Sequence, residues 1–294
     1  VWDEGGDSGR RAVSFSPSLE GLDFDGYLSP APILPVSASR GCYWARCAFC
    51  PEAAGDRQPY AAANADELSE IILRAKKERG VRFVHFTDNA LSPLHLQKFA
   101  ENLKGSGIKW YGFARLERQL EEPLFMKNLA EGGCAMLQLG IESASKRLLD
   151  LMRKGIDPDR ASVIVENARS AGIRVFGYFL FGMPTETPEE ARRTIGWIKS
   201  HPEALTFLNL SLMNFPRGGE MEAAPDQFGL ESVRGRDEKN DLSLYLEYAG
   251  KETMERRELR RILTEAKRDP VIKKMLLRSP PWLTSNHGAF APLP

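Results

Sequence analysis

The chain has 294 residues and a mass of 32.9 kDa, which suits one large domain or one domain with an appendage. Its 40 basic and 40 acidic residues cancel to a formal charge of zero, so it lacks the basic excess of a protein that binds nucleic acid in bulk. The longest apolar stretch, near residues 175–183, is far shorter than the roughly 20 residues that span a bilayer, and the N-terminus has no signal pattern. We therefore expect a cytoplasmic protein without membrane partners.

Residues 1–33 are rich in Gly, Ser, Asp and Pro and show no sustained periodicity, which predicts an N-terminal arm or linker. Beyond them, short apolar runs alternate with amphipathic stretches, the pattern of repeated βα units. Strands are expected at Leu34–Ser37, Arg82–Thr87, Ile108–Phe113, Ala135–Ile141, Arg174–Phe181 and Leu205–Leu210. Each strand is apolar almost throughout, as in a parallel sheet covered by helices. The pattern allows either an open doubly wound sheet or a curled partial barrel.

Start and stop signals mark several helices between these strands. Capping residues followed by proline predict helix starts at Ser92-Pro93, Asp157-Pro158 and Thr187-Pro188, the last with Glu190 completing a capping box. Glycines at positions 80, 105 and 172 are expected to end helices. After Pro216 the alternation breaks, so residues 217–294 are expected to form a C-terminal extension that caps the open side of the sheet. It should contain a charged helix near residues 251–268, whose interleaved basic and acidic residues form a solvated face.

Three of the four cysteines lie in one nine-residue window just beyond the first predicted strand. Cys42, Cys47 and Cys50 follow the spacing Cys-x4-Cys-x2-Cys, at the strand end where α/β folds place their active sites. Thiolates so close in sequence can hold one soft centre, either zinc or an iron–sulfur cluster. No histidine lies nearby to complete a zinc site, and three ligands favour a cluster with one open iron.

A two-iron cluster of the plant-ferredoxin kind is an alternative, because those ferredoxins use the same spacing together with a distant fourth cysteine. Cys134 is the remaining cysteine, at the start of the fourth predicted strand, where a buried small apolar residue is ordinary. That alternative would make the protein an electron carrier or a metal-stabilised interaction module. Six βα units are too many for a ferredoxin domain, which favours an enzyme.

Further motifs stand at the ends of the predicted strands. They are Thr87-Asp88-Asn89, Gly140-Ile141-Glu142-Ser143 and Phe181-Gly182-Met183-Pro184-Thr185-Glu186-Thr187. Together with the cysteine loop, these motifs resemble the radical S-adenosylmethionine (radical SAM) enzymes, in the branch whose members often carry an N-terminal cobalamin-binding domain. The resemblance covers residues 27–216. One departure is that four residues separate the first two cysteines, where most of the superfamily has three; the sequence is similar in this respect to a Cys-Tyr-Trp variant of the same branch.

The resemblance implies a partial (β/α)6 TIM-like barrel over residues 34–216, with the N-terminal arm and the C-terminal helical extension on either side. The cysteines at 42, 47 and 50 would hold a [4Fe–4S] cluster, whose fourth iron is chelated by the amino and carboxylate groups of S-adenosylmethionine. Reductive cleavage of that molecule would start radical modification of a small-molecule or peptide substrate. An electron donor such as flavodoxin or ferredoxin is implied as a partner.

Cobalamin is the further cofactor that the resemblance raises. Residues 24–30 are similar to the linker that joins the cobalamin domain to the barrel in relatives, and the sequence starts at Val1 rather than at Met. We therefore expect a further segment before Val1, and the sequence leaves open whether that segment is a cobalamin domain. With it, methyl transfer to an unreactive carbon would be the leading reaction; without it, hydrogen abstraction followed by rearrangement, oxidation or thiolation is equally open.

The resemblance also assigns residues to S-adenosylmethionine. Phe49 matches an aromatic position near the adenine, and Gly182 would let the end of its strand approach the same ring. Asp88 occupies the place where the family contacts the methionine amino group, usually with a Gly-Gly-Glu sequence that is absent here. Loop packing for Phe49 and turn chemistry for Asp88 are the ordinary structural explanations.

Three charged residues complete the expected site. Glu142 ends an apolar strand and matches a ribose-binding position, so its charge should emerge toward water or a ligand. Arg115 and Lys154 match basic positions that approach the methionine carboxylate or the ribose in relatives. A surface salt bridge is the more ordinary explanation for both cations.

Overall fold

The computed structural model describes residues 32–53, 59–235, 244–250 and 252–278, together with Gly21 and Gly26. The expected N-terminal arm therefore lies almost entirely outside the described residues. Among the described residues, no helix combines the length and the apolar character needed to cross a membrane.

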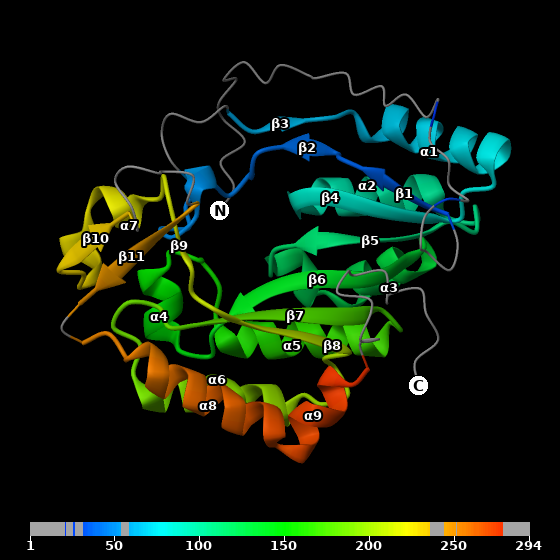
Figure 1. Cartoon of the computed structure of the whole chain (residues 1–294). Coiled ribbons are helices and arrows are strands. Elements are labelled where there is room, and N and C mark those ends of the chain that lie inside the picture. Colours follow the sequence, from blue (N-terminus) through cyan, green and yellow to red (C-terminus); the bar gives the residue numbers. More distant parts are fainter. Residues whose placement is uncertain are drawn as a thin grey trace.

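A six-stranded parallel sheet forms the centre of the molecule (Figure 1). In spatial order its strands are β1 (Ile33–Val36), β4 (Phe83–Leu91), β5 (Lys109–Ala114), β6 (Cys134–Glu142), β7 (Arg174–Phe181) and β8 (Phe207–Leu212). The spatial order is the chain order, and every neighbouring pair is parallel. A doubly wound sheet reverses its strand order part-way, whereas this one does not. The sheet is therefore the partial barrel of the two arrangements that the sequence allowed.

The helices that connect these strands cover one face of the sheet (Figure 1). They are α1 (Ala65–Arg79), α2 (Pro93–Leu103), α3 (Pro123–Glu131), α4 (Lys146–Leu151), α5 (Pro158–Ser170) and α6 (Pro188–Ser200). The caps predicted from the sequence are confirmed. Ser92, Asp157 and Thr187 each accept a hydrogen bond from a backbone N–H in the first turn, and the capping box with Glu190 is complete. Gly80 ends α1 in the left-handed conformation, with φ of 69°.

The strand boundaries agree with the prediction most closely for β7 and least for β4. β4 continues four residues past the predicted end at Thr87, because Leu91 pairs with Ala114 after a break in register. β8 starts two residues later than predicted, since Leu205 belongs to the preceding turn and donates its N–H to the carbonyl of His201. Both differences arise from pairing with a neighbouring strand. Such pairing cannot be predicted from the composition of one strand alone.

Short antiparallel pairings flank the barrel. β2 (Ser39–Arg40) pairs with β3 (Ala61–Ala62), and β11 (Tyr245–Ala249) lies between β9 (Phe215–Pro216) and β10 (Ser232–Arg234). The other short elements are α7 (Glu220–Ala223) and the 3-10 turns Pro51–Ala53, Arg118–Glu121 and Pro225–Phe228. The sequence predicted none of these elements, because each is too short to carry a periodic pattern.

The C-terminal extension contains α8 (Arg256–Arg268) and α9 (Pro270–Leu276). The basic residues of α8 are exposed, so the expected solvated face is confirmed, and the opposite face of the helix buries an apolar stripe against α6 and α9. The stripe consists of Leu259, Ile262, Leu263 and Ala266, at the spacing of one helical face. Many arginines and glutamates on the opposite face obscured this stripe in the sequence. The described part of the extension therefore packs on the flank formed by α6 and β8.

Candidate functional site at the carboxyl edge of the sheet

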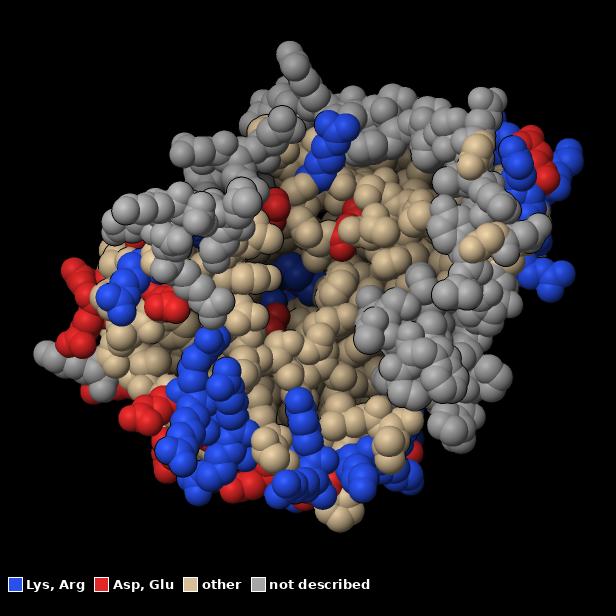
Figure 2. All heavy atoms as spheres, viewed as in Figure 1, with Lys and Arg blue, Asp and Glu red and all other residues tan. Residues whose placement is uncertain are grey.

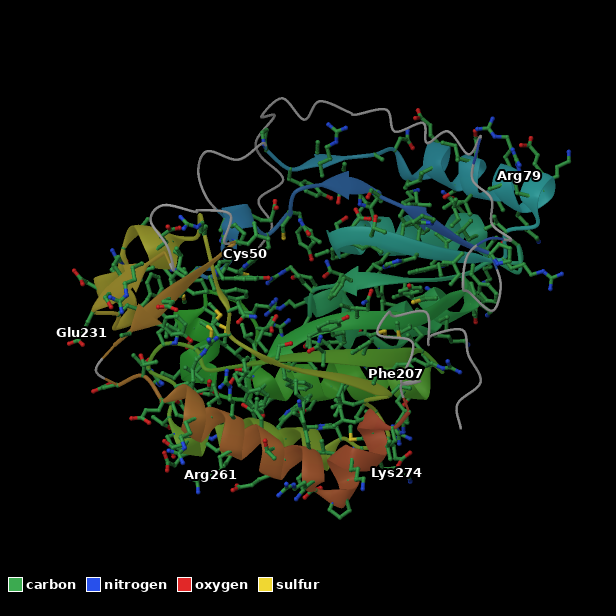
Figure 3. The ribbon with its side chains drawn as sticks, in the orientation of Figure 1. Cys50, Arg79, Phe207, Glu231, Arg261 and Lys274 are labelled. Carbon is green, nitrogen blue, oxygen red and sulfur yellow. The ribbon has the colours of Figure 1, made fainter. Side chains whose placement is uncertain are left out.

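The cysteine loop lies at the carboxyl edge of the sheet, between β2 and the turn at Pro51–Ala53. Figure 3 shows Cys50 at this edge and Arg79 at the opposite one. Backbone hydrogen bonds fix the loop from two sides: the N–H of Ala48 donates to Met152 O at 3.0 Å, and Met221 N–H donates to Ala48 O at 3.1 Å. The loop is therefore held between the end of α4 and the start of α7.

The three loop cysteines are free thiols, Cys47 buried and the other two half-buried. Burial raises the pKa of Cys47, and the nearby Lys154 and Arg115 charges oppose that rise. Among the described residues, no three His, Cys, Asp or Glu side chains converge on a position for a single metal ion. Cys42 and Cys47 both act electrostatically on Cys50, so the three thiols lie near one another on the loop. Cysteines of an iron–sulfur cluster ligate different irons, so three thiols on one fixed loop fit a cluster.

Cys134 is far from this loop. It begins β6, whereas Glu142 ends the same strand at the carboxyl edge, so eight residues at about 3.3 Å each place the two about 26 Å apart. The Cys134 thiol is fully buried beside the carbonyl of Met136. A two-iron cluster that shares Cys134 with the loop is therefore excluded.

Arg115 lies just beyond β5 and is 6% exposed, so the explanation by a surface salt bridge is wrong. Its Nε donates to Glu117 Oε1 at 3.0 Å, and its Nη2 donates to the carbonyl of Lys154 at 2.5 Å. Its remaining nitrogen, Nη1, is 4.0 Å from Cys47 Sγ. The structure thus places this guanidinium beside a cysteine sulfur.

Glu142 and Lys154 form a second ion pair at the same edge, with 2.6 Å between Oε1 and Nζ. Both side chains are close to nine-tenths buried, so this pair also is no surface salt bridge. Burial opposes the charge on Lys154, but the Glu142 carboxylate and Cys47 together outweigh burial and raise the pKa of the amine. Lys154 Nζ also lies 5.8 Å from the centre of the Phe49 ring.

The backbone at this pair is strained and crowded. Glu142 has a φ of 64°, rare for a residue with a side chain, and the β6–β7 register breaks between Gly140 and Glu142. A Cβ at Gly140 would stand 2.6 Å from the Glu142 carboxylate and 2.9 Å from the Lys154 amine. The pair therefore occupies the space directly above the end of β6.

Asp88 serves the backbone rather than the open site. It is 3% exposed, and its two carboxylate oxygens accept the N–H of Ala38 at 3.1 and 2.9 Å and the hydroxyl of Ser39 at 2.5 Å. Burial raises the pKa of this carboxyl, and the hydrogen bonds from Ala38 and Ser39 oppose that rise. These bonds tie β4 to the segment that leads into the cysteine loop.

Gly182 begins the turn after β7, with a φ of 86°. Glu186 closes the turn by accepting the N–H groups of Gly182 and Met183, the latter at 3.1 Å. Tyr248 of β11 donates its hydroxyl to Gly182 O at 2.7 Å. Glu186 is 1% exposed and its other oxygen has no partner, so burial raises its pKa to about 7.

The concave face of the sheet lies below these residues and is lined by half-buried rings. Tyr178 stands 4.9 Å from Phe113 and 4.8 Å from Phe176, measured between ring centres. Gln138 is fully buried among them: its amide nitrogen donates to the Tyr178 hydroxyl at 2.9 Å, and its amide oxygen has no partner. Figure 2 shows a hollow in this side of the molecule, with basic side chains in its depth and acidic ones at its margin.

The sequence profile of the radical SAM superfamily matches residues 36–198, more than half of the chain. The chain belongs to the radical SAM superfamily. It is a radical SAM enzyme, and members of this superfamily use a [4Fe–4S] cluster and S-adenosylmethionine, generally with a small-molecule substrate and an electron donor. The predicted family and partial barrel are confirmed.

Curated relatives of this radical SAM chain are named as methyltransferases. An uncharacterised methyltransferase of Pyrococcus horikoshii is 30% identical over 188 residues, 62% of this chain and 40% of that protein. The cytidylyl-2-hydroxyethylphosphonate methyltransferase of Streptomyces wedmorensis is 32% identical over 50% of this chain and 28% of its own length. The chain thus spans less than half of the length of these relatives.

Solved structures support the fold of this radical SAM chain at low sequence identity. The methyltransferase TsrM from Kitasatospora setae, solved with cobalamin and a [4Fe–4S] cluster, has a TM-score of 0.58 at 19% identity, over 70% of this chain and 42% of that one. The cobalamin-dependent enzyme OxsB has a TM-score of 0.58 at 16% identity, over 74% of this chain and 38% of that one.

Several residues of the site were not singled out in the sequence. Glu117 and Trp44 surround Arg115, while Glu186 and Tyr248 hold the turn at Gly182. Glu186 stands within a quoted strand-end motif, and an acid in an otherwise apolar and glycine-rich turn was a signal for it. Tyr248 had no such signal, because its contact depends on how the C-terminal extension folds back.

Proposed function

We propose that this enzyme holds a [4Fe–4S] cluster on Cys42, Cys47 and Cys50 and reductively cleaves S-adenosylmethionine. The observation that carries the proposal is the arrangement of three free thiols on one loop, fixed at the carboxyl edge of the barrel beside two buried cations. When bound, the cluster supplies an electron to the sulfonium of S-adenosylmethionine and thereby starts radical chemistry.

The chain's own residues have separate tasks in this proposal. Arg115 and Lys154 offset the negative charge that three thiolates gather at the edge of the sheet. Glu142 stands at the end of β6, where a carboxylate oxygen can accept hydroxyl hydrogens of the ribose. Phe49 and the turn at Gly182 would border the adenine. Asp88 is assigned to positioning the approach to the cysteine loop, in place of the methionine amino group.

We infer methyl transfer as the reaction class, because the curated relatives are methyltransferases by name and the similar solved enzymes bind cobalamin. The concave face supports a small-molecule substrate, since it combines rings that can pack on an apolar body with a buried polar amide at Gln138. Flavodoxin or ferredoxin is proposed as the electron donor.

The experiment is anaerobic reconstitution of the chain, followed by iron analysis and by reduction in the presence of S-adenosylmethionine. We expect four irons per chain and formation of 5′-deoxyadenosine. Replacing Cys42, Cys47 or Cys50 by alanine should abolish both. Cys134→Ala is the matched control and should keep both, because its thiol is about 26 Å from the site. Loss of the cluster in a folded Cys134→Ala protein would contradict the proposal.

A further inference from the structure

The four-residue spacer between Cys42 and Cys47 contains a left-handed turn. Ala45 has a φ of 45°, a conformation that non-glycine residues seldom adopt and that persists only where the surroundings over-determine it. The residue before it, Trp44, contacts Arg153, Gly155 and Arg115. The contacts of Trp44 are therefore expected to hold this turn in place.

Trp44 packs against the segment that follows α4. Its indole Nε1 donates to the carbonyl of Arg153 at 3.1 Å. Gly155 has a φ of 68°, and a Cβ there would stand 2.4 and 2.6 Å from two carbons of the indole. The ring thus lies directly on the backbone of Gly155, which only a glycine permits at this distance.

The other partner of the indole is Arg115, whose guanidinium carbon lies 4.0 Å from the ring centre. Such stacking restricts the plane of a guanidinium. Glu117 and the carbonyl of Lys154 take up Nε and Nη2, and Tyr43 donates to the same Glu117 oxygen at 3.1 Å. With the plane and two nitrogens fixed, Nη1 is directed at Cys47 Sγ, 4.0 Å away.

We propose that Trp44 and Arg115 form a positioning device that holds an N–H donor and a positive charge against the Cys47 sulfur, and so raises the reduction potential of the cluster. This inference rests on the proposed function, in which Cys47 is a cluster ligand. The reduced cluster carries one more negative charge than the oxidised one, so a cation and a donor at the sulfur stabilise the reduced state. The spacer between Cys42 and Cys47 has one residue more than in most of the superfamily, and this additional length lets the indole of Trp44 lie over Arg115.

Other cations near the sulfur are less suited to this role. Lys154 acts on Cys47 as a charge, more strongly than Arg115, but its Nζ is bonded to Glu142 at 2.6 Å, whereas Arg115 directs an N–H donor at the sulfur. Arg46 lies 5.2 Å from the centre of the same indole and is exposed. Arg115 is also paired with Glu117, but that contact is made through Nε, so the guanidinium still presents Nη1 to Cys47. Within the described part of the chain, Arg46 shares the indole but makes no hydrogen bond to the sulfur, so it is a matched control.

The test is a potentiometric titration of the reconstituted full chain, in which the reduced cluster is followed by electron paramagnetic resonance. Arg115→Gln should make reduction at least about tenfold less favourable, equivalent to about 59 mV for one electron. Trp44→Leu should shift the potential in the same direction, because the guanidinium loses its stack. Trp44→Phe and Arg115→Lys should recover part of the shift, and Arg46→Gln should leave the potential unchanged.

The outcomes separate this inference from the proposed function. A wild-type chain that takes up no four-iron cluster would overturn both. An Arg115→Gln protein with full iron content and an unchanged potential would overturn only the positioning role. Should Arg115→Gln fail to hold the cluster, Trp44→Leu decides, because it leaves Arg115 and its ion pair in place. A shift of equal size in Arg46→Gln would also contradict the inference, since it would indicate general charge rather than a directed donor.

Discussion

Charges at the site are buried in pairs. Isolated charges cost several kcal/mol to remove from water, and removing one partner of a buried pair leaves that cost uncompensated. Glu142 therefore has two tasks at once: it neutralises Lys154 and it offers an oxygen at the end of β6. A substitution at this position has to distinguish these two tasks.

We predict that Glu142→Ala weakens S-adenosylmethionine binding at least about tenfold and also lowers the free energy of unfolding by about 3 kcal/mol, because Lys154 is left buried without its partner. Glu142→Gln keeps an oxygen for Lys154, so it should lose less stability while still losing affinity. Binding is measured by equilibrium dialysis on the reconstituted protein, and stability by urea unfolding. An unchanged dissociation constant in both variants would remove Glu142 from the binding site.

Glu186 gives the second residue-scale prediction. Its pKa is raised to about 7 in the folded protein, above the ordinary value of 4.5, because burial disfavours the charged form. The folded state therefore holds a proton that the unfolded state has lost. The contribution of the protonated Glu186 carboxyl to the free energy of unfolding is fully present below about pH 4.5 and is lost as the pH rises through about 7. We expect it to amount to about 3 kcal/mol.

The measurement is urea unfolding of wild type and Glu186→Gln at pH 5 and pH 8. Glutamine resembles the protonated carboxyl, so the variant should lose less stability than wild type between these two values. Glu190 does not interfere, because its hydrogen bonds from Arg147 and Ser145 outweigh burial and lower its pKa to about 2. Equal loss in wild type and variant would show that the Glu186 carboxyl does not titrate in this window.

At the scale of elements, the turn after β7 is held by the C-terminal extension. A Cβ at Gly182 would stand 2.5 Å from a methyl carbon of Leu259 in α8, and Tyr248 of β11 binds the Gly182 carbonyl. The same glycine has a positive φ, so both conformation and packing require it. Through this contact, α8 helps to set the position of a turn that we propose to border the adenine.

We predict that Gly182→Ala costs about 1–3 kcal/mol of stability through strain and crowding, and that Leu259→Ala costs about 2–5 kcal/mol through a cavity. The double variant should cost less than the sum by about 1 kcal/mol, because removing the Leu259 side chain makes room for the new methyl group. The measurement is a double-mutant cycle by urea unfolding. Strict additivity would show that α8 and the turn are not coupled.

Sequence patterns predicted the elements that are long and locally determined. All six barrel strands and the caps at Ser92, Asp157 and Thr187 follow from periodicity and capping chemistry. The choice between a doubly wound sheet and a barrel could not be made from these patterns, because it depends on the spatial order of the strands. The apolar stripe through which α8 packs was not identified, since the charges of α8 outnumber the four apolar residues of its buried face.

In the candidate site, too, local features could be predicted from the sequence, whereas features that depend on tertiary contacts could not. The cysteine loop could be predicted because its three ligands are consecutive in one short segment. The burial of Arg115 and of the pair formed by Glu142 and Lys154 could not, since each depends on contacts between strands and loops far apart in the chain. Trp44 belongs to the Cys-Tyr-Trp sequence that accompanies the longer spacer, but its contacts with Arg115 and Gly155 could not be predicted, because these residues come together only in the folded barrel.

At the scale of the whole molecule, the site draws on segments from residue 42 to residue 259. The cysteine loop is fixed by α4 and α7, and the turn after β7 is fixed by β11 and α8. The described elements thus all belong to the barrel or pack on its flank. The chain spans 40% of the length of its Pyrococcus relative.

Cobalamin binding is the property that depends most on whether the chain contains a unit besides the barrel and its extension. The resemblance to the radical SAM branch implies a cobalamin domain on the N-terminal side of the barrel, and the described residues form no second parallel sheet. We predict that the 294-residue chain does not bind hydroxocobalamin stoichiometrically, although its cluster and S-adenosylmethionine chemistry are intact. The measurement is a titration of hydroxocobalamin into the reconstituted chain, followed through the visible spectrum of the corrinoid. A control sample of the same preparation should form 5′-deoxyadenosine on reduction, so that absent binding is not a failure of folding. Tight one-to-one binding would show that the barrel or the extension after Pro216 holds the corrinoid, and would contradict the expected placement of the cobalamin domain before Val1.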